Sequence, residues 1–251
     1  MSKASKSNII KSSELEISKI KYSDLKTLDN GAKIVYINYN TDNNPILLQT
    51  PECDMPFDAG WFDDSGDNCG KFSLKASIGS DQVFSDKLGE FDKKLKDDAM
   101  KKSKEWFKKA KLTQDAVDTM YHNMLNISKD VETGEPNGKY PPQFTFKIVF
   151  RDGKCLCKLY DETKTKIEIE NLSGSIEEHQ LKKMLVKGAK VKAIIKCNGV
   201  WISGNKFGCT WRAEQMKVTR AASFEDYAFE DSDEEEEVQK KQKTLLECLP
   251  F

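Results

Sequence analysis

Strict alternation of apolar and polar residues between positions 143 and 218 constrains the fold of this chain more than any other feature. Over residues 143–151, the apolar set Phe144, Phe146, Ile148 and Phe150 alternates with Thr145, Lys147, Val149 and Arg151. A period of two places successive side chains on opposite faces of a β-strand, one of which is buried. The period recurs over residues 154–160, 165–170, 189–197, 200–203 and 206–218, the last two joined by the hairpin dipeptide Gly204-Asn205. This half of the chain is therefore predicted to be a sheet with one apolar face.

The first half of the chain combines short strand signals with one helical pattern. We predict strands near residues 15–20, 33–39, 46–50 and 72–78, and a loop over residues 51–70, where Pro, Gly and Asp gather. Over residues 84–110 the apolar positions recur every three, four or seven residues between many lysines, which predicts an amphipathic helix. Thr113 is expected to N-cap a second helix that ends near Leu125. Short strands with a helical insertion at about 84–126 predict a mainly β fold with α insertions, namely an OB-fold-like, partly open Greek-key β-barrel.

The charge of the chain is segregated. Residues 223–251 carry ten acidic and three basic side chains, whereas residues 1–222 carry 31 acidic and 37 basic ones. Residues 1–11 are rich in Ser and Lys and are expected to form a disordered leader. The chain is thus predicted to hold one domain over residues 12–220, followed by an acidic, flexible tail over residues 221–251.

The polar face of the predicted strands is basic and carries scattered rings. A single strand of nucleic acid needs cations that follow its backbone and flat rings on which its bases stack. Lysine on the solvent face of a sheet is common, so each lysine taken alone also fits an ordinary solvated face. Trp211 shares the apolar parity of its strand and is assigned to the core. The residues predicted to bind single-stranded nucleic acid are Lys147, Arg151, Lys158, Tyr160, Lys192, Lys196, Trp201, Lys206 and Arg212.

The acidic tail interleaves aromatic rings with carboxylates, as a nucleic acid combines bases with phosphates. We expect it to compete with nucleic acid for the basic face and, once displaced, to recruit partner proteins; a merely solubilising tail is the alternative. The predicted tail residues are Phe224, Asp226, Tyr227, Phe229, Glu230, Asp231, Asp233, Glu234, Glu235, Glu236, Glu237 and Phe251.

Motifs that would indicate an enzyme, a cofactor or a membrane anchor are absent from the sequence. There is no phosphate-binding glycine loop, no H-E-x-x-H and no G-x-S-x-G. The two histidines stand alone, and the aspartates at 58, 63, 64 and 67 fit a polar turn better than a divalent-metal loop. The seven cysteines fit reduced core thiols better than a disulfide framework or a zinc site. We therefore expect no catalytic residue, metal or cofactor, and a protein that stays inside the cell and is not secreted.

The predicted lysine and aromatic barrel, the long inserted helix, the hairpin Gly199–Trp211 and the acidic tail that ends at Phe251 together resemble the phage gene-2.5-type single-stranded DNA-binding proteins. More specifically, the chain resembles the branch of that family found in large DNA viruses of eukaryotes. The resemblance implies an OB-fold core that coats single-stranded DNA during replication, recombination or repair at the site of viral DNA replication, in the host nucleus or cytoplasm. It also implies contact of the tail with a polymerase, helicase or primase, and it allows a homodimer.

One departure from the family pattern concerns the end of the chain. Lys240, Lys241 and Lys243 separate the acidic run from Phe251, whereas the acidic run of the phage proteins extends nearly to the terminal Phe. The role of Phe251 therefore stays open. Two other functions also stay open, an acidic-tailed protein-interaction or chaperone-like module and a minor structural protein of a virion.

Overall fold

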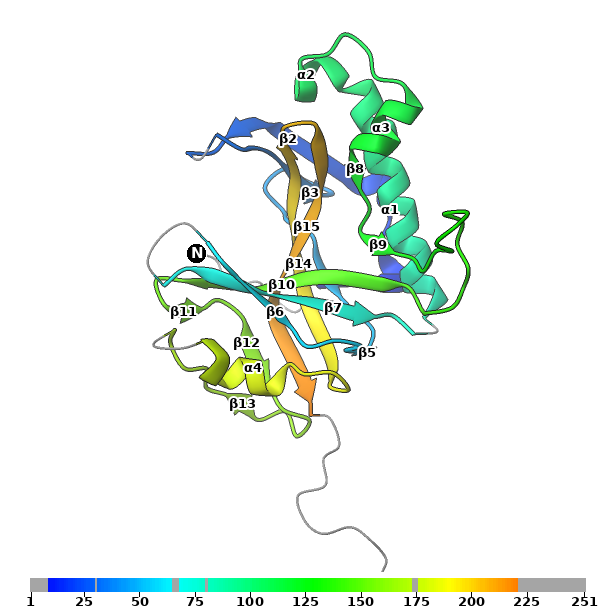
Figure 1. Ribbon diagram of the computed structural model, residues 1–251. Helices are drawn as coiled ribbons and strands as arrows, with labels where there is room; N and C mark the ends of the chain where they lie inside the picture. Colours follow the sequence, from blue (N-terminus) through cyan, green and yellow to red (C-terminus); the bar gives the residue numbers. More distant parts are fainter. Residues whose placement is uncertain (1–8, 30, 65–67, 80, 173–175, 221–251) are drawn as a thin grey trace, which may run out of the picture. The chain divides into compact units, whose positions relative to one another are not determined.

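Five strands that pair in a closed ring form the centre of the fold. The computed structural model describes residues 9–29, 31–64, 68–79, 81–172 and 176–220, and Figure 1 shows their arrangement. Neighbours around the ring are β5 (Cys53–Asp54), β7 (Gly70–Ser77), β10 (Gln143–Arg151), β15 (Lys206–Thr219) and β14 (Lys190–Ser203), which pairs again with β5. The described part of the chain is mainly β, as the sequence predicts.

Neighbouring strands of the ring share very different numbers of residue pairs. β7 and β10 share eight residue pairs and β14 and β15 share thirteen. By contrast, β5 meets β7 only at Asp54 and Ser77, and β10 meets β15 only at Lys147 and Arg212. The ring is therefore held by two extensive ladders and closed by three short contacts, since β5 and β14 share only two residue pairs.

Shorter strands extend the sheet beyond the ring. β14 also pairs with β4 (Leu47–Gln49), which is followed by β1 (Ile9–Lys11), and with β3 (Lys33–Tyr39), which is followed by β2 (Ile20–Thr27). The remaining strands are β6 (Gly60–Asp63) on β7, β8 (Tyr121–His122) on β15, β9 (Leu125–Asn126) and β11 (Lys154–Cys155) on β10, and β12 (Lys158–Tyr160) on β15, followed by β13 (Lys166–Ile167).

Two β-bulges interrupt the long β14–β15 hairpin. The register shifts between Ile194 and Ile195, where Glu214 is the extra residue on β15, and between Cys197 and Gly199, where Asn198 is the extra residue on β14. Each bulge reverses the alternation of the strand that carries it. As a result Lys217 and Trp201 are partly exposed, whereas Met216 and Val200 are buried.

Among the residues that the structure describes, the α-helices are α1 (Gln82–Lys101), α2 (Ser103–Phe107), α3 (Gln114–Met120) and α4 (Gln180–Met184). Single 3₁₀ turns lie at Ser12–Glu14, Ile17–Lys19 and Ile176–Glu178. α1 begins where the side chain of Asp81 accepts a hydrogen bond from the Phe84 N–H, at 2.8 Å, because an N-cap carboxylate satisfies a free backbone donor.

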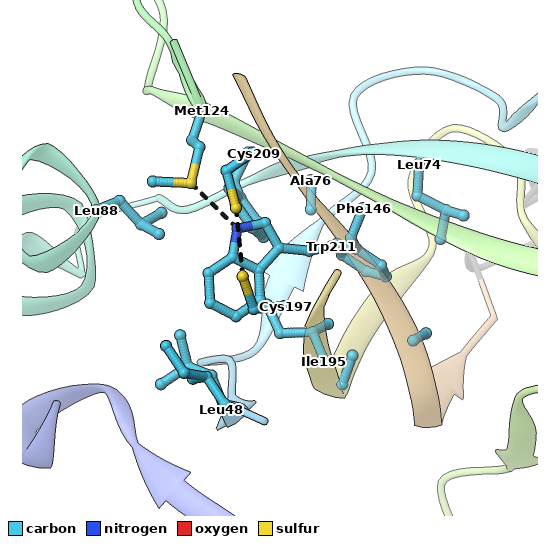
Figure 2. Packing of buried hydrophobic residues seen from close by; sticks show 14 of the residues in the cluster. Leu48, Leu74, Ala76, Leu88, Met124, Phe146, Ile195, Cys197, Cys209 and Trp211 are labelled. Carbon is cyan, nitrogen blue, oxygen red and sulfur yellow. Dashed lines mark hydrogen bonds between the residues drawn. The ribbon is translucent and has the colours of Figure 1, made fainter. Parts of the chain in front are cut away.

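The apolar stripe of α1 packs against the inner faces of the ring strands. Its Phe91 meets Trp211 edge-on at 5.7 Å between ring centroids, and its Phe84 meets Phe144 at 5.7 Å. Figure 2 shows Trp211 at the centre of this core, where its indole N–H points at the sulfur of Met124, 3.1 Å away. The prediction that Trp211 belongs to the core is confirmed, since its exposed fraction is 1%.

Two buried carboxylates of α1 anchor the helix to the sheet. The Tyr121 hydroxyl donates to Asp92 at 2.6 Å, and the Tyr22 hydroxyl donates to Asp98 at 2.7 Å. Asp98 also forms an ion pair with Lys94 at 2.7 Å. A buried polar group is stable only when its hydrogen bonds are made, so these pairs fix α1 against β2 and β8 as well as through apolar contact.

Several sequence predictions are corrected by the structure. Ile9–Lys11, assigned to the leader, forms β1, and in place of the strand expected at 15–20 the chain forms the 3₁₀ turn Ile17–Lys19, which leads into β2. The helix expected over 84–110 ends at Lys101, because the chain turns there to bury Trp106 against Tyr22, with ring centroids 5.2 Å apart. The second helix ends at Met120 rather than near Leu125, the loop over 51–70 contains β5 and β6, and the strand expected at 165–170 is reduced to Lys166–Ile167.

Candidate nucleic-acid interface

Three cations lie side by side in one row on the outer face of the sheet. Lys196 of β14 pairs directly with Arg212 of β15, and Arg212 pairs directly with Lys147 of β10. Residues directly opposite one another on neighbouring strands project from the same face, with Cβ atoms about 5 Å apart. The row Lys196–Arg212–Lys147, called the central row below, therefore crosses three strands and also crosses the short contact that closes the ring between β10 and β15.

A second basic row lies on the same face, four residues along β14. Lys192 pairs with Lys217, and Lys217 pairs with Tyr160 of β12. Between the two rows, Ile194 pairs with Gln215, and Gln215 pairs with Lys158. At the rise of an antiparallel strand, Lys192 and Lys196 are about 13 Å apart along β14.

Most of these cations have no carboxylate partner. Arg212 pairs with Glu214 at 2.7 Å and Lys217 with Glu52 at 3.6 Å. Within the described ranges, no ion pair joins a carboxylate to any other cation of the face, namely Lys147, Lys158, Lys192 and Lys196. Like charges directly opposite one another destabilise a sheet, so the two rows cost folding free energy that a bound polyanion would offset.

Lys147 is a partly buried cation of the central row. Burial lowers the pKa of its ammonium group below 10.5, the nearby Lys71 lowers it further, and Asp64 opposes both effects. A lysine in this situation gains more from an added negative charge than a lysine in open solvent, because both causes penalise its charged form.

Two hollows open on the outer face beside these rows. The first, of 330 Å³, is called the Tyr160 hollow; the second, of 310 Å³, is called the Tyr36 hollow. The Tyr160 hollow is lined by Gln49, Tyr160, Lys164, Lys192, Ala193, Ile194, Gln215 and Lys217. The Tyr36 hollow is lined by Ser23, Lys26, Tyr36, Ile37, Asn38, Asn43, Pro45, Lys196, Cys197, Asn198 and Arg212. Neither lining includes a carboxylate from the described ranges of the chain.

Aromatic rings accompany the cations. Tyr36 is 40% exposed, and the Lys26 ammonium lies 5.2 Å from the centre of its ring. On the other side of the central row, Phe62 of β6 is 55% exposed and pairs with Lys71 of β7. The central row continues across the sheet, because Lys147 pairs with Ser73 of β7 and Ser73 pairs with Gly60 of β6. Phe62 is two residues from Gly60 on the same strand, so it projects from the same outer face.

The structure brings six of the nine predicted strand-binding residues together around the two rows. Two more, Trp201 and Lys206, lie on the same face towards the end of the hairpin. Trp201 is opposite Gly208, and its ring centroid lies 6.4 Å from that of His122. The Lys206 ammonium donates a hydrogen bond to the Thr119 carbonyl at 2.7 Å. Arg151 is exposed at the end of β10, beside the turn to β11. The six residues that come together are Lys147, Lys158, Tyr160, Lys192, Lys196 and Arg212.

The sequence pattern did not identify every residue of the candidate interface. Some of these residues lie in the first half of the chain, where strand patterns are short, and Gln215 and Lys217 follow a bulge that reverses the parity of β15. The missed residues are Lys26, Tyr36, Gln49, Phe62, Lys71, Lys164, Gln215 and Lys217. The predicted tail residues, from Phe224 to Phe251, lie outside the described residues.

Metal-binding clusters and membrane-spanning helices are both missing from the described part of the chain. No group of three or more His, Cys, Asp or Glu side chains there could hold a metal ion. Among the same residues, no helix has the length and apolar character needed to cross a membrane.

Comparison with solved structures finds similarity to single-stranded DNA-binding proteins of bacteriophages. One is gp2.5, a single-stranded DNA-binding protein encoded by bacteriophage T7, which is 13% identical with a TM-score of 0.41 over 74% of this chain and 98% of that chain. Another is the single-stranded DNA-binding protein from bacteriophage Enc34, which is 13% identical with a TM-score of 0.36 over 87% of this chain and 99% of that chain. The Enc34 protein in complex with ssDNA is 12% identical, with a TM-score of 0.35 over 83% of this chain and 99% of that chain.

No family model and no curated protein matches the sequence. Identities and TM-scores this low leave the function to be argued from the residues described above.

Proposed function

We propose that this chain is a non-enzymatic single-stranded DNA-binding protein that holds its ligand across the outer face of β14, β15 and β10. The observation that carries the proposal is the central row, in which Lys196, Arg212 and Lys147 stand directly opposite one another. A fold that places like charges in register at an energetic cost is suited to a ligand with a regular series of negative charges.

The rings on this face favour a single strand over a duplex. Tyr36, Tyr160 and Phe62 are partly or well exposed beside the cations. A single strand presents the faces of its bases to such rings, whereas the base faces of a duplex are stacked on one another. Cations with partly exposed rings therefore fit a single strand better than a duplex or a protein partner.

The arrangement of the ring supports an OB-fold-like, Greek-key barrel as its description. Numbered along the chain, the ring strands β5, β7, β10, β14 and β15 are first to fifth, and they are neighbours in the order first, second, third, fifth, fourth. The fourth strand thus returns beside the first through a long connection, as in a Greek key.

The biological setting is part of the proposal. We propose that the protein coats single-stranded DNA during replication, recombination or repair. This role is the one that its resemblance to the branch found in large DNA viruses of eukaryotes implies. In this proposal the acidic segment over residues 221–251 competes with DNA for the basic face and recruits a polymerase, helicase or primase. The protein acts inside the infected cell, in the nucleus or cytoplasm, and a homodimer is compatible with this role.

A binding titration tests the proposal. Fluorescence anisotropy of labelled oligo-dT at low salt should show tight binding, much weaker binding to a duplex of equal length, and a log–log salt slope of about −0.7 per phosphate contacted. The double variant Lys147→Gln/Lys196→Gln should lower the magnitude of that slope by about 1.4. A matched control, Lys93→Gln/Lys104→Gln, removes two exposed helix lysines without an ion pair in the structure.

Three results would contradict the proposal. One is equal affinity for duplex and single strand, and another is an equal loss of affinity in the two double variants. The third is capture of basic proteins by a chain that ignores DNA, which would favour the protein-interaction alternative instead.

A further inference from the structure

The two hollows on the outer face contain matching sets of side chains. Each offers one tyrosine ring, three cations and at least two carboxamides, and no carboxylate lines either hollow. In the Tyr160 hollow the cations and amides are Lys164, Lys192, Lys217, Gln49 and Gln215. In the Tyr36 hollow they are Lys26, Lys196, Arg212, Asn38, Asn43 and Asn198.

This set matches the chemistry of a nucleotide. A base has apolar faces, which stack on an aromatic ring, and a polar edge, which both donates and accepts hydrogen bonds. A carboxamide carries a donor and an acceptor on one side chain, so it can pair with the edge of a base. Ammonium and guanidinium groups at the rim then meet the phosphates on either side.

The Tyr160 hollow shows how the parts are placed. Gln49, Ile194 and Gln215 form one row across β4, β14 and β15, so that the apolar Ile194 is flanked by an amide on each side. The next row along the strands places Tyr160 beside Lys217. The hollow thus has an apolar floor, an aromatic side, amides at its edges and cations around it, within a volume of 330 Å³.

The two tyrosines mark the ends of a fixed span. Tyr160 lies in the row of Lys192, whereas the backbone of Tyr36 lies against Gly199, where a Cβ would come within 3.0 Å of the Tyr36 Cα. Residues 192 and 199 are about 20 Å apart along β14 at the rise of a strand, and the strands of the two tyrosines, β12 and β3, lie three strand spacings apart across the sheet, about 14 Å. The two tyrosines are therefore about 25 Å apart. The central row lies between these two levels.

We infer that each hollow holds one nucleobase, so that a bound strand is fixed at two base positions while the backbone between them crosses the central row. This inference rests on the proposed function and adds to it a binding register: two bases, about 25 Å apart, are held, and the nucleotides between them contribute mainly their phosphates.

Oligonucleotides with bases at only two positions test the inference. In a series of DNA strands of constant length, two thymidines are separated by an increasing run of abasic residues, and the affinity of the full chain is measured by anisotropy. The affinity is expected to pass through a maximum at the separation that spans about 25 Å, because only that spacing fills both hollows at once. A fully abasic strand of the same length measures the phosphate contribution alone.

Variants assign the two bases to the two hollows. Tyr160→Leu and Tyr36→Leu should each reduce the affinity for the best two-base strand by about tenfold, which is the expected loss of one stacked base, and neither should change the affinity for the abasic strand. Tyr140→Leu, at an exposed tyrosine outside both linings, is the control and should change neither affinity.

The outcomes separate this inference from the proposed function. If the chain fails to bind oligo-dT, the proposed function is wrong. If it binds oligo-dT but the affinity does not depend on the separation of the two bases, the function stands and the two-base register is wrong. Equal losses in the tyrosine variants and in Tyr140→Leu would also overturn the register.

Discussion

Removal of one charge from the central row is predicted to move stability and affinity in opposite directions. In Lys196→Gln the side chain keeps most of its length and loses its charge opposite Arg212. Two unit charges about 6 Å apart repel by roughly 0.7 kcal/mol in bulk water and by about 3 kcal/mol at an effective dielectric constant of 20. Because Glu214 lies 2.7 Å from Arg212 and offsets part of this repulsion, we expect the free protein to gain about 0.5 kcal/mol.

The assay compares urea unfolding of the free protein with DNA binding of the same preparation. At low salt, Lys196→Gln should raise the free energy of unfolding, and added salt should remove most of that gain, because salt screens the repulsion. The same variant should bind oligo-dT more weakly, with a salt slope smaller in magnitude by about 0.7. Lys93→Gln on α1 provides the control and should change neither quantity beyond its error.

The reasoning would be refuted by a Lys196→Gln protein that unfolds more easily at low salt than the unmodified chain. It would also be refuted if the affinity for DNA stayed the same while stability rose, since Lys196 would then be a repelled cation without a ligand.

Three further predictions concern other parts of the molecule. Burial raises the pKa of Asp92 above 3.8, so its protonated form favours folding, and that contribution to stability is lost as pH rises through the raised pKa. Asp92→Asn should therefore flatten the fall in the free energy of unfolding above about pH 4, measured by urea unfolding at several pH values. Gly199 has φ +109°, and a Cβ there would lie 2.4 Å from a carbonyl oxygen of β3, so Gly199→Ala should destabilise the fold by about 2 kcal/mol or more in a thermal or urea melt. By contrast, Gly89→Ala, in an open position of α1, should stabilise the fold by about 0.5–1 kcal/mol. A phosphate beside Lys147 should reverse the lowering of its pKa, so DNA binding at alkaline pH should take up protons, and calorimetry in buffers of different ionisation enthalpy measures this uptake. Lys147→Gln should reduce the uptake; an unchanged uptake in that variant would mean that the lysine lies away from DNA.

The alternation pattern predicted the inner face of the sheet well because burial on one side leaves a direct record in the sequence. Phe144, Phe146, Ile148 and Phe150 are all buried, as their parity indicates. Parity failed only after each bulge, where one extra residue moves every later side chain to the other face. Lys217 and Gln215 therefore reach the outer face, although an uninterrupted alternation would place them in the core.

Elements that depend on distant partners could not be predicted from local pattern. β1 exists because Ile9–Lys11 pairs in parallel with Leu47–Gln49, and strands of two residues such as β5 and β8 are too short to show a period. The α1 helix ends early because Trp106 finds a buried position against Tyr22, a contact between residues far apart in the sequence.

The candidate site also combines features that the sequence predicts with features that depend on distant strand partners. The sequence identifies which side chains are basic and face outward, but the register that places Lys147, Arg212 and Lys196 in one row is set by the pairing of three strands. The residues of the Tyr36 hollow from β2 and β3 join the site only because the β2–β3 hairpin pairs with β14.

The single residue pair between β10 and β15 has a mechanical consequence. Few backbone hydrogen bonds hold these two strands together, so their edges should separate more readily than those of β7 and β10, which share eight pairs. Under the proposed function, a strand of phosphates laid over Lys147 and Arg212 would bridge the same joint from outside. Binding would then favour closure of the ring, and closure would favour binding.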